Sequence, residues 1–285
     1  MNKMNIGEFS LWTKEPNTIY QGGHLFVKEF DFDTKNRFKK RLVRVYLPSN
    51  YEFDNPNKRF KVIYMLDGKN IFDDYTSFVG EWGFDEEMED MIIDGEIEGY
   101  IVVGIDAPND GDDRTLEMSP ENIHFKKEIT HKDNIGYGTK LGDFIFKVVK
   151  PEVDALFHTR KEKENTIIGG SSMGGISSFY LALFYNEYVG SVLAYSPAFF
   201  LYVHEEFKKL LDSKISNVKL DKIYLYTGGT GFEAVFIKDT FYVYNYLKEH
   251  GYNDNQVKLV YLKEAEHNEK AWNKYIKDAL RFLNS

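Results

Sequence analysis

Two stretches near the start of the chain alternate polar and apolar residues. They cover residues 23–31 and 40–47, and the polar segment 33–36 (Asp-Thr-Lys-Asn) lies between them. Period-two alternation is typical of strands with one buried and one solvated face. The pattern therefore predicts an antiparallel hairpin that ends before Pro48.

After Phe60 the pattern changes to short, nearly continuous apolar runs, which are typical of strands buried on both faces. These runs cover residues 61–66, 100–105, 166–168, 191–195, 222–226 and 257–262. Helical periodicity separates most of them, over residues 84–93, 140–157, 176–185, 240–249 and 270–283. Pro151 is expected to kink the second of these helices or to start a new one. The alternation predicts an α/β fold: a mostly parallel sheet with helices on both faces and the hairpin as an antiparallel edge.

Residues 106–138 interrupt this rhythm with prolines, glycines and many polar residues. A loop of this length in a compact domain is usually a lid or a binding loop, and a solvated excursion is the alternative. No internal repeat and no low-complexity linker is visible. Residues 1–285 are therefore expected to form a single domain that carries this insertion.

Composition narrows the classes of function. The net charge of −9 is spread along the chain, which argues against a nucleic-acid or anionic-membrane partner. No apolar run approaches the ~18 residues of a membrane span, and no secretory signal is visible, so a cytoplasmic enzyme is the expectation. The chain has no cysteine, which excludes disulfides, thiol catalysis and thiolate metal sites.

The strongest chemical signal follows the run at 166–168. Residues 170–174 read Gly-Ser-Ser-Met-Gly, which fits G-x-S-x-G, and a helical pattern comes next. In a strand-to-helix turn of this kind a serine is exposed in a strained backbone, and bulkier residues at the two glycine positions would collide. Ser172 is therefore the candidate nucleophile.

A serine hydroxyl needs a base, and the base needs an orienting acid. Of the seven histidines, His267 alone follows the last predicted strand, which is the position expected of the base. For the acid we favour Glu233, which ends a glycine-rich turn after the strand at 222–226, with Asp239 as the alternative. Glu264 and Glu266 flank the histidine and are expected to face solvent.

Acyl transfer also requires hydrogen-bond donors for the developing oxyanion. The backbone N–H of Met173, directly after the serine, is one candidate. A second is expected in the loop after the first buried strand, from Gly68 or Lys69, with Gly68 allowing close approach to the substrate. A plain Asp-Gly turn is the alternative interpretation of that loop.

Taken together, these residues resemble the putative-esterase family of α/β-hydrolases, which includes siderophore, feruloyl and acetyl-xylan esterases, S-formylglutathione hydrolase and mycolyltransferases. The likeness spans about residues 40–283. It is carried by residues 64–73 (YMLDGKNIFD), 80–83 (GEWG), 170–175 (GSSMGG) with Ser196-Pro-Ala198, and 267–272 (HNEKAW). The sequence departs from the family in the longer turn before Glu233.

The resemblance implies an α/β-hydrolase fold, with Ser172 as nucleophile, His267 as base and the loop at 67–70 beside the oxyanion. It also implies that Arg114 fills the family's arginine position near the start of the long loop at 106–138, where it contacts either a substrate acid group or the carboxylates of that same long loop. Trp82 and Trp272 are candidates to line the substrate site, as is Phe199 in the aromatic segment 195–202.

The expected function is hydrolysis of a small-molecule carboxylic ester through an acyl-enzyme. Acyl transfer by the same residues is one alternative, and an inactive hydrolase fold used for binding is another. No phosphate-binding loop or dinucleotide fingerprint is present, and the acidic turn at 109–113 lacks the ligand spacing of an EF-hand, so no cofactor or metal is expected. The aromatic segment 195–202 suits an aryl ester, a sugar ring or an acyl chain equally well, and we lean only slightly to a sugar-linked or siderophore-like ester.

Overall fold

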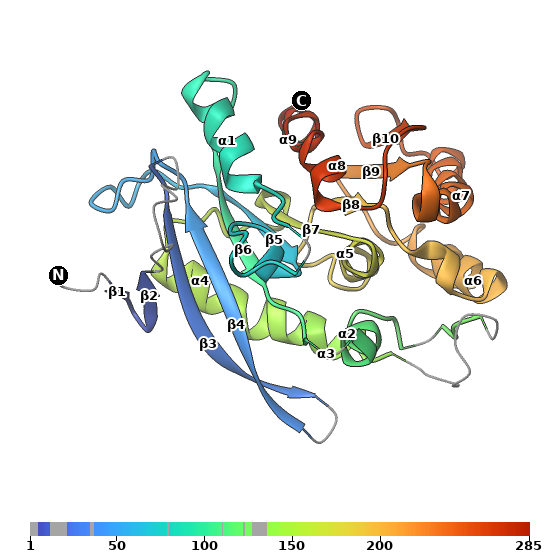
Figure 1. The fold of residues 1–285 in the computed structure, drawn as a ribbon, viewed down its shortest axis with the longest axis horizontal. Coiled ribbons are helices and arrows are strands. Elements are labelled where there is room, and N and C mark those ends of the chain that lie inside the picture. The colour runs from blue at the N-terminus through green and yellow to red at the C-terminus, as the bar shows by residue number, and fades with distance from the viewer. Residues whose placement is uncertain are drawn as a thin grey trace.

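A single ten-stranded sheet runs through the protein in the order β1-β2-β3-β4-β6-β5-β7-β8-β9-β10 (Figure 1). The computed structural model describes residues 5–11, 22–34, 37–78, 80–109, 111–121, 123–126 and 136–285. The strands are β1 (Asn5–Ile6), β2 (Phe9–Leu11), β3 (His24–Thr34), β4 (Arg37–Leu47), β5 (Lys61–Leu66), β6 (Tyr100–Ile105), β7 (Thr166–Ser171), β8 (Ser191–Tyr195), β9 (Lys222–Gly228) and β10 (Val257–Leu262).

The sheet is mixed, as the sequence predicts. The pairings from β1 to β4, and that of β4 with β6, are antiparallel, whereas β6, β5, β7, β8, β9 and β10 pair in parallel. The predicted hairpin is β3–β4, and the residues of its turn at 35–36 lie outside the described part of the chain. Because all parallel strands point the same way, their carboxyl ends share one edge of the sheet.

Helices cover both faces of the sheet (Figure 1). They are α1 (Phe84–Ile93), α2 (Gly111–Glu117), α3 (Gly138–Asp143), α4 (Lys150–Leu156), α5 (Met173–Phe184), α6 (His204–Lys214), α7 (Ile237–Glu249), α8 (Glu269–Asn273) and α9 (Ile276–Asn284), with short turns η1 (Gly68–Asn70), η3 (Lys163–Asn165), η4 (Phe199–Leu201) and η5 (Gly231–Phe236). Side chains of α1, α8 and α9 pack on one face, and those of α3 to α7 on the other.

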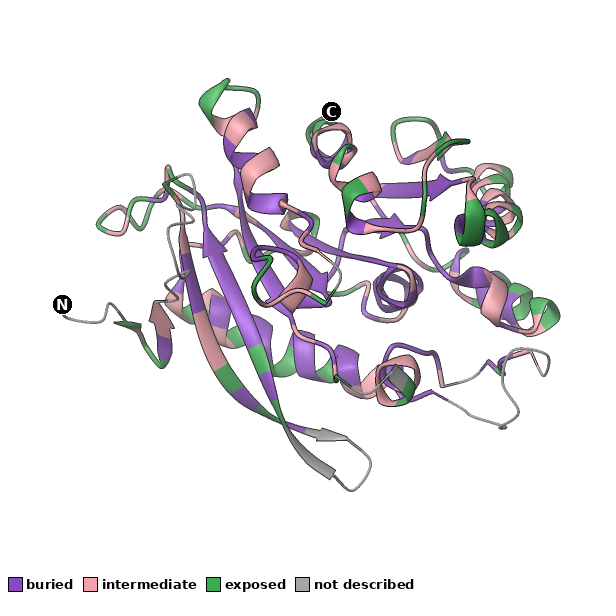
Figure 2. Cartoon of the chain, viewed as in Figure 1, coloured by how far each residue is buried: buried purple, intermediate pink, exposed green. Residues whose placement is uncertain are grey.

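A hydrophobic core lies on each face of the sheet, and successive residues of a central strand point alternately into one core and the other. In β5, Val62 and Tyr64 belong to the core under α5, whereas Ile63 and Met65 belong to the core under α1 and α9. This explains why these strands read as continuous apolar runs rather than as alternating ones. Figure 2 shows the result: the central strands are buried along their length, whereas exposed residues lie on the outer turns of the helices, in connecting loops and on β3 and β4.

Two predicted helices differ from the structure in their continuity. The helix over 140–157 contains a π-helical turn, η2 (Phe144–Val149), just before Pro151 enters the first turn of α4. Proline has no N–H to donate, and the wider turn before it accommodates the missing hydrogen bond. The helix predicted over 270–283 is two helices, α8 and α9, separated at residues 274–275. Their buried residues keep a helical spacing across the break, so the apolar pattern does not reveal it.

The insertion at 106–138 is described only in part, because residues 110, 122 and 127–135 lie outside the described ranges. Its described portion contains α2 and a strand-like bridge between Phe125 and Tyr202. Its role as a lid therefore stays a prediction. Within the described ranges, no helix combines the length and the apolar character that crossing a membrane requires.

Candidate active site

Ser172 occupies the turn that joins β7 to α5. Its φ of +56° is a left-handed value that non-glycine residues rarely adopt. A Cβ at Gly170 would lie 2.8 Å from the backbone of Gly174, and one at Gly175 would lie 2.7 Å from the carbonyl oxygen of Tyr195. The strained turn therefore closes only with glycine at these positions, and it holds Ser172 at the carboxyl edge of the sheet.

The structure brings Glu233, and not Asp239, to His267. The Oε2 atom of Glu233 contacts Nδ1 of His267. Its Oε1 atom accepts hydrogen bonds from the backbone N–H of Gly228 at 2.7 Å and from the hydroxyl of Ser196 at 2.5 Å. The carboxylate is completely buried, and these charge-assisted bonds compensate for its lost hydration. Because Nδ1 faces the carboxylate, Nε2 is the ring nitrogen left for another partner.

Three aromatic rings pack around the imidazole of His267, and one of them, Trp272, meets it edge-on at 5.0 Å and 86°. Phe236 stacks on the imidazole with ring centroids 4.5 Å apart and an angle of 22°. Phe232 meets it edge-on at 5.3 Å and 84°, although 61% of the Phe232 side chain remains exposed. Both residues come from η5, the same turn that carries Glu233. One short segment therefore supplies the carboxylate partner of the histidine and two of the three rings that pack on it.

Ser196 is a site residue to which the sequence analysis assigned no role. Its hydroxyl donates to Glu233 and accepts a hydrogen bond of 2.9 Å from the indole N–H of Trp272. Its own φ is +43°, which marks a second strained position beside the first. Its position directly after β8 could have indicated a role, because catalytic residues of parallel sheets lie at the carboxyl ends of the strands.

The loop after β5 packs directly on the first turn of α5. Asp67 has a φ of +59°, and its Oδ2 lies 3.1 Å from where a Cβ of Gly174 would be. A Cβ at Gly68 would lie 2.5 Å from the backbone carbon of Gly104 in β6. Close packing against the sheet therefore requires glycine at position 68, and the approach of its backbone to a substrate stays a prediction. The loop nevertheless lies beside the N–H groups at the start of α5.

Arg114 bonds to the carboxylate of this loop. Its Nε and one terminal nitrogen donate to the two oxygens of Asp67, each at 2.7 Å. Burial disfavours the charged guanidinium, yet the Asp67 carboxylate raises the pKa of Arg114 above its ordinary value. Glu117, three residues further along α2, binds Arg41 of β4 through both oxygens. Helix α2 is thus fixed to the loop at 67–70 and to the sheet.

A cavity of about 490 Å³ lies in front of Ser172, within the range of small-molecule sites. Five of the residues predicted from the sequence line it: Lys69, Arg114, Ser172, His267 and Trp272. Asn70 lines it as part of the predicted loop at 67–70, and Phe78 and Glu269 also line it although neither was predicted as a site residue. Phe78 is 82% exposed and lies at the rim, whereas Glu269 is 5% exposed.

Two of the predicted substrate-binding residues do not reach this cavity. Trp82 is buried behind it, where its ring packs edge-on against Tyr195 and beside Trp272. Phe199 is 2% exposed and packs against aromatic rings of α5 and α6 in the core. An aromatic residue after a central strand can support the site from inside as easily as line it, and the sequence does not distinguish the two cases.

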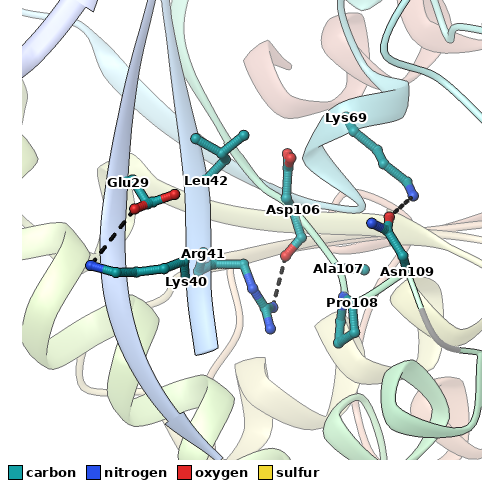
Figure 3. Close-up of a pocket in the computed structure, with 9 residues that line it drawn as sticks. All are labelled: Glu29, Lys40, Arg41, Leu42, Lys69, Asp106, Ala107, Pro108 and Asn109. Atoms are coloured by element: carbon teal, nitrogen blue, oxygen red, sulfur yellow. Dashed lines mark hydrogen bonds and ion pairs between the residues drawn. The ribbon is translucent and has the colours of Figure 1, made fainter. Parts of the chain in front are cut away.

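A second cavity of about 400 Å³ adjoins the first and shares Lys69, Ala107, Pro108 and Asn109 with it (Figure 3). Figure 3 shows Lys69 directed at Asn109, where its ammonium donates to the amide oxygen at 2.9 Å. Lys40 pairs with Asp31, and Arg41 donates to the carbonyl of Asp106. The charged side chains of this cavity are thus paired with other charged groups, an amide or the backbone.

Comparisons with known proteins agree with this geometry. The family model described as putative esterase matches residues 37–283. Uncharacterized protein YbbA of Bacillus subtilis (strain 168) is 21% identical over 257 residues, which cover 88% of this chain and 95% of that protein. Siderophore hydrolase EstA from Aspergillus nidulans superimposes with a TM-score of 0.71 at 14% identity, covering 96% of this chain and 99% of its own. The BES protein from Bacillus cereus gives 0.69 at 17%, covering 95% and 98%. At such identities the two structures establish the fold alone.

Proposed function

The chain belongs to the putative esterase family and is a carboxylic ester hydrolase, and from this premise we propose that it works through an acyl-enzyme on Ser172. The observation that carries the proposal is the contact of Glu233 with His267 behind a cavity that both His267 and Ser172 line. The strained turn at Ser172 supports the same assignment, because such strain persists where function requires it.

In the proposed first step, Nε2 of His267 takes the proton of Ser172 as the Oγ atom attacks the ester carbonyl. Glu233 accepts the Nδ1 proton, which keeps the imidazole in the tautomer that can act as a base and stabilises the imidazolium that forms. The protonated His267 then gives its proton to the leaving alcohol. A water molecule, activated by the same nitrogen, releases the acid and restores the serine.

The proposed oxyanion hole consists of the backbone N–H of Met173 and that of Lys69 or Gly68. The close packing of the loop after β5 on the first turn of α5 supports this choice, because it brings the two backbone segments together. Such donors act where charge develops, and losing one typically costs about 2.7–4 kcal/mol of transition-state stabilisation.

For the substrate we propose an ester of a sugar-linked or siderophore-like compound. Polar side chains and two aromatic residues, Trp272 and the exposed Phe78 at the rim, line the cavity, which suits a ring that carries polar substituents. The name of the siderophore hydrolase that shares the fold points the same way. The cytoplasmic location, the lack of a nucleic-acid partner and the lid role of residues 106–138 stay predictions.

Acyl transfer to an alcohol remains the alternative within the same chemistry, and a test of alcohol acceptors against water distinguishes it. A binding module without activity is less well supported. Such a protein has no need to keep a buried carboxylate on the histidine of a cavity that also exposes a strained serine.

The test is hydrolysis of p-nitrophenyl acetate, combined with labelling by a fluorophosphonate and mass analysis of the labelled peptide. We expect the native protein to turn over and to carry the label on Ser172, and Ser172→Ala to fold normally and do neither. Ser171→Ala is the matched control, because Ser171 is the neighbouring serine of the same cavity and is expected to leave labelling intact. Turnover that persists in Ser172→Ala would refute the assignment.

A further inference from the structure

Glu269 is a buried acid inside the candidate active site that the proposed mechanism does not use. It is the first residue of α8, two positions after His267, and it lines the cavity together with Ser172 and His267. Only 5% of it is exposed to solvent. Acids are rarely buried to this extent unless another group compensates for their lost hydration.

The contacts of Glu269 within the described residues are weak for a buried carboxylate. Its one hydrogen bond from another side chain comes from Nδ2 of Asn70 at 3.5 Å, the limit of such a bond. Glu233, by comparison, receives bonds of 2.7 Å and 2.5 Å as well as its contact with His267. Acceptor positions of Glu269 therefore remain available on the wall of the cavity.

Several neighbours act on the charge of Glu269. Burial raises its pKa, and the carboxylate of Asp67 adds to this, while its own backbone N–H, His267 and Arg114 oppose the shift. A bound anion would meet repulsion from Asp67 and Glu269 together. A bound cation would be repelled by Arg114 and, whenever His267 is protonated, by His267 as well. A neutral hydrogen-bond donor meets neither penalty and satisfies the carboxylate.

We propose that Glu269 determines specificity by accepting a hydrogen bond from a hydroxyl group that the ester carries close to its scissile bond. This rests on the proposed function, since it places the hydroxyl in the cavity in front of Ser172. A site built around a buried acceptor discriminates against a substrate without the donor, because the acceptor is then left unpaired. The enzyme thus prefers hydroxylated esters to plain ones of equal size.

The experiment compares esters that differ by one hydroxyl. p-Nitrophenyl butyrate and p-nitrophenyl 3-hydroxybutyrate differ by a hydroxyl in the acyl group. Ethyl butyrate and 2-hydroxyethyl butyrate differ by a hydroxyl in the alcohol, and their hydrolysis is measured from the acid that is released. The measured quantity is the ratio of kcat/KM for the hydroxylated ester to that for the plain one. The variants are Glu269→Ala, Glu269→Gln and Glu266→Gln. Glu266 is the matched control, because it is an exposed acid of the same loop that does not line the cavity.

We expect the native ratio to exceed one in at least one pair and to fall about tenfold in Glu269→Ala, as loss of a hydrogen bond to a charged group predicts. In Glu269→Gln the amide oxygen still accepts, so the ratio should fall less, and in Glu266→Gln it should not change. A purely structural role would lower both esters of a pair equally and leave the ratio constant in Glu269→Ala, which overturns the inference. If the native protein hydrolyses none of the esters, the proposed function fails first and the inference with it.

Discussion

The change of Glu233 to glutamine tests the proposed chemistry most sharply, because the surroundings permit only one orientation of the new amide. The backbone N–H of Gly228 donates to Oε1 of Glu233 at 2.7 Å and cannot accept a hydrogen bond. The amide oxygen of Gln must therefore occupy that position. The NH2 group is then directed at Nδ1 of His267.

An NH2 group at this point reverses the tautomer of the imidazole. Nδ1 becomes the acceptor, so the ring proton moves to Nε2, where it faces the serine and blocks proton transfer. The cost of the wrong tautomer in a serine hydrolase is about 10⁴ in kcat, equivalent to about 5.5 kcal/mol of transition-state stabilisation. The change keeps the volume of the side chain and two of its hydrogen-bond acceptor contacts, so the fold should survive it.

The assay is kcat for p-nitrophenyl acetate near pH 7.5, with thermal unfolding to confirm that each variant is folded. Asp239→Asn is the matched control, since it makes the same chemical change at the alternative acid, and it should keep activity within about twofold of the native rate. A kcat of Glu233→Gln within tenfold of the native value would refute the reasoning. If Asp239→Asn lost activity instead, Asp239 would be the orienting acid.

Three further changes test the surroundings of the site. Arg114→Gln leaves Asp67 without its two-point partner, so the loop at 67–70 shifts and kcat should fall about 10–100-fold with little change in KM; Arg114→Lys should recover part of the loss. Gly68→Ala places a Cβ 2.5 Å from the backbone of β6 and should lower the free energy of unfolding by about 1–3 kcal/mol, measured in urea. Glu269→Gln should gain stability over the native protein as pH rises. Burial raises the pKa of Glu269 in the folded state above its ordinary value of 4.5, so the folded protein holds this proton more tightly than the unfolded chain does. As the pH rises from 4.5 through the raised pKa, Glu269 becomes charged and the native protein loses stability, whereas the Gln variant does not. The difference in Tm between the two proteins should therefore grow from pH 4 to pH 8, and a constant difference would contradict it.

Most of the fold could be predicted from the sequence because its signals are local. The apolar runs of β5 to β10 and the G-x-S-x-G pattern around Ser172 are short sequence patterns that can be recognised without knowing the rest of the fold. The break between α8 and α9 was missed for the same reason: the buried residues on both sides keep one helical spacing, although the backbone between them does not.

The candidate site could be predicted where position along a strand decides the outcome, and not where packing decides it. Ser172 follows β7 and His267 follows β10, both parallel strands, and the carboxyl edge that such strands share brings these residues together. Phe199 also follows a central strand, and Trp82 directly precedes α1, yet both side chains are buried in the core and neither lines the cavity. A large aromatic side chain points into the core or into the cavity depending on the space that residues distant in sequence leave for it. A local sequence pattern contains no information about that space.

Glu269 shows that part of the missing information was present in the sequence. The chain around His267 carries several acids, and those at 264 and 266 are exposed, as expected. What separates Glu269 from them is Asn268, whose side chain accepts a hydrogen bond from the N–H of Ala271 at 2.9 Å and so begins α8. Once the cap fixes the start of the helix, residues three apart share a face. Glu269 must then point the same way as Trp272, which is buried at the cavity.

The capping asparagine thus determines which acid enters the active site. Replacing Asn268 with alanine should therefore weaken the specificity that we assign to Glu269, even though Asn268 itself does not line the cavity.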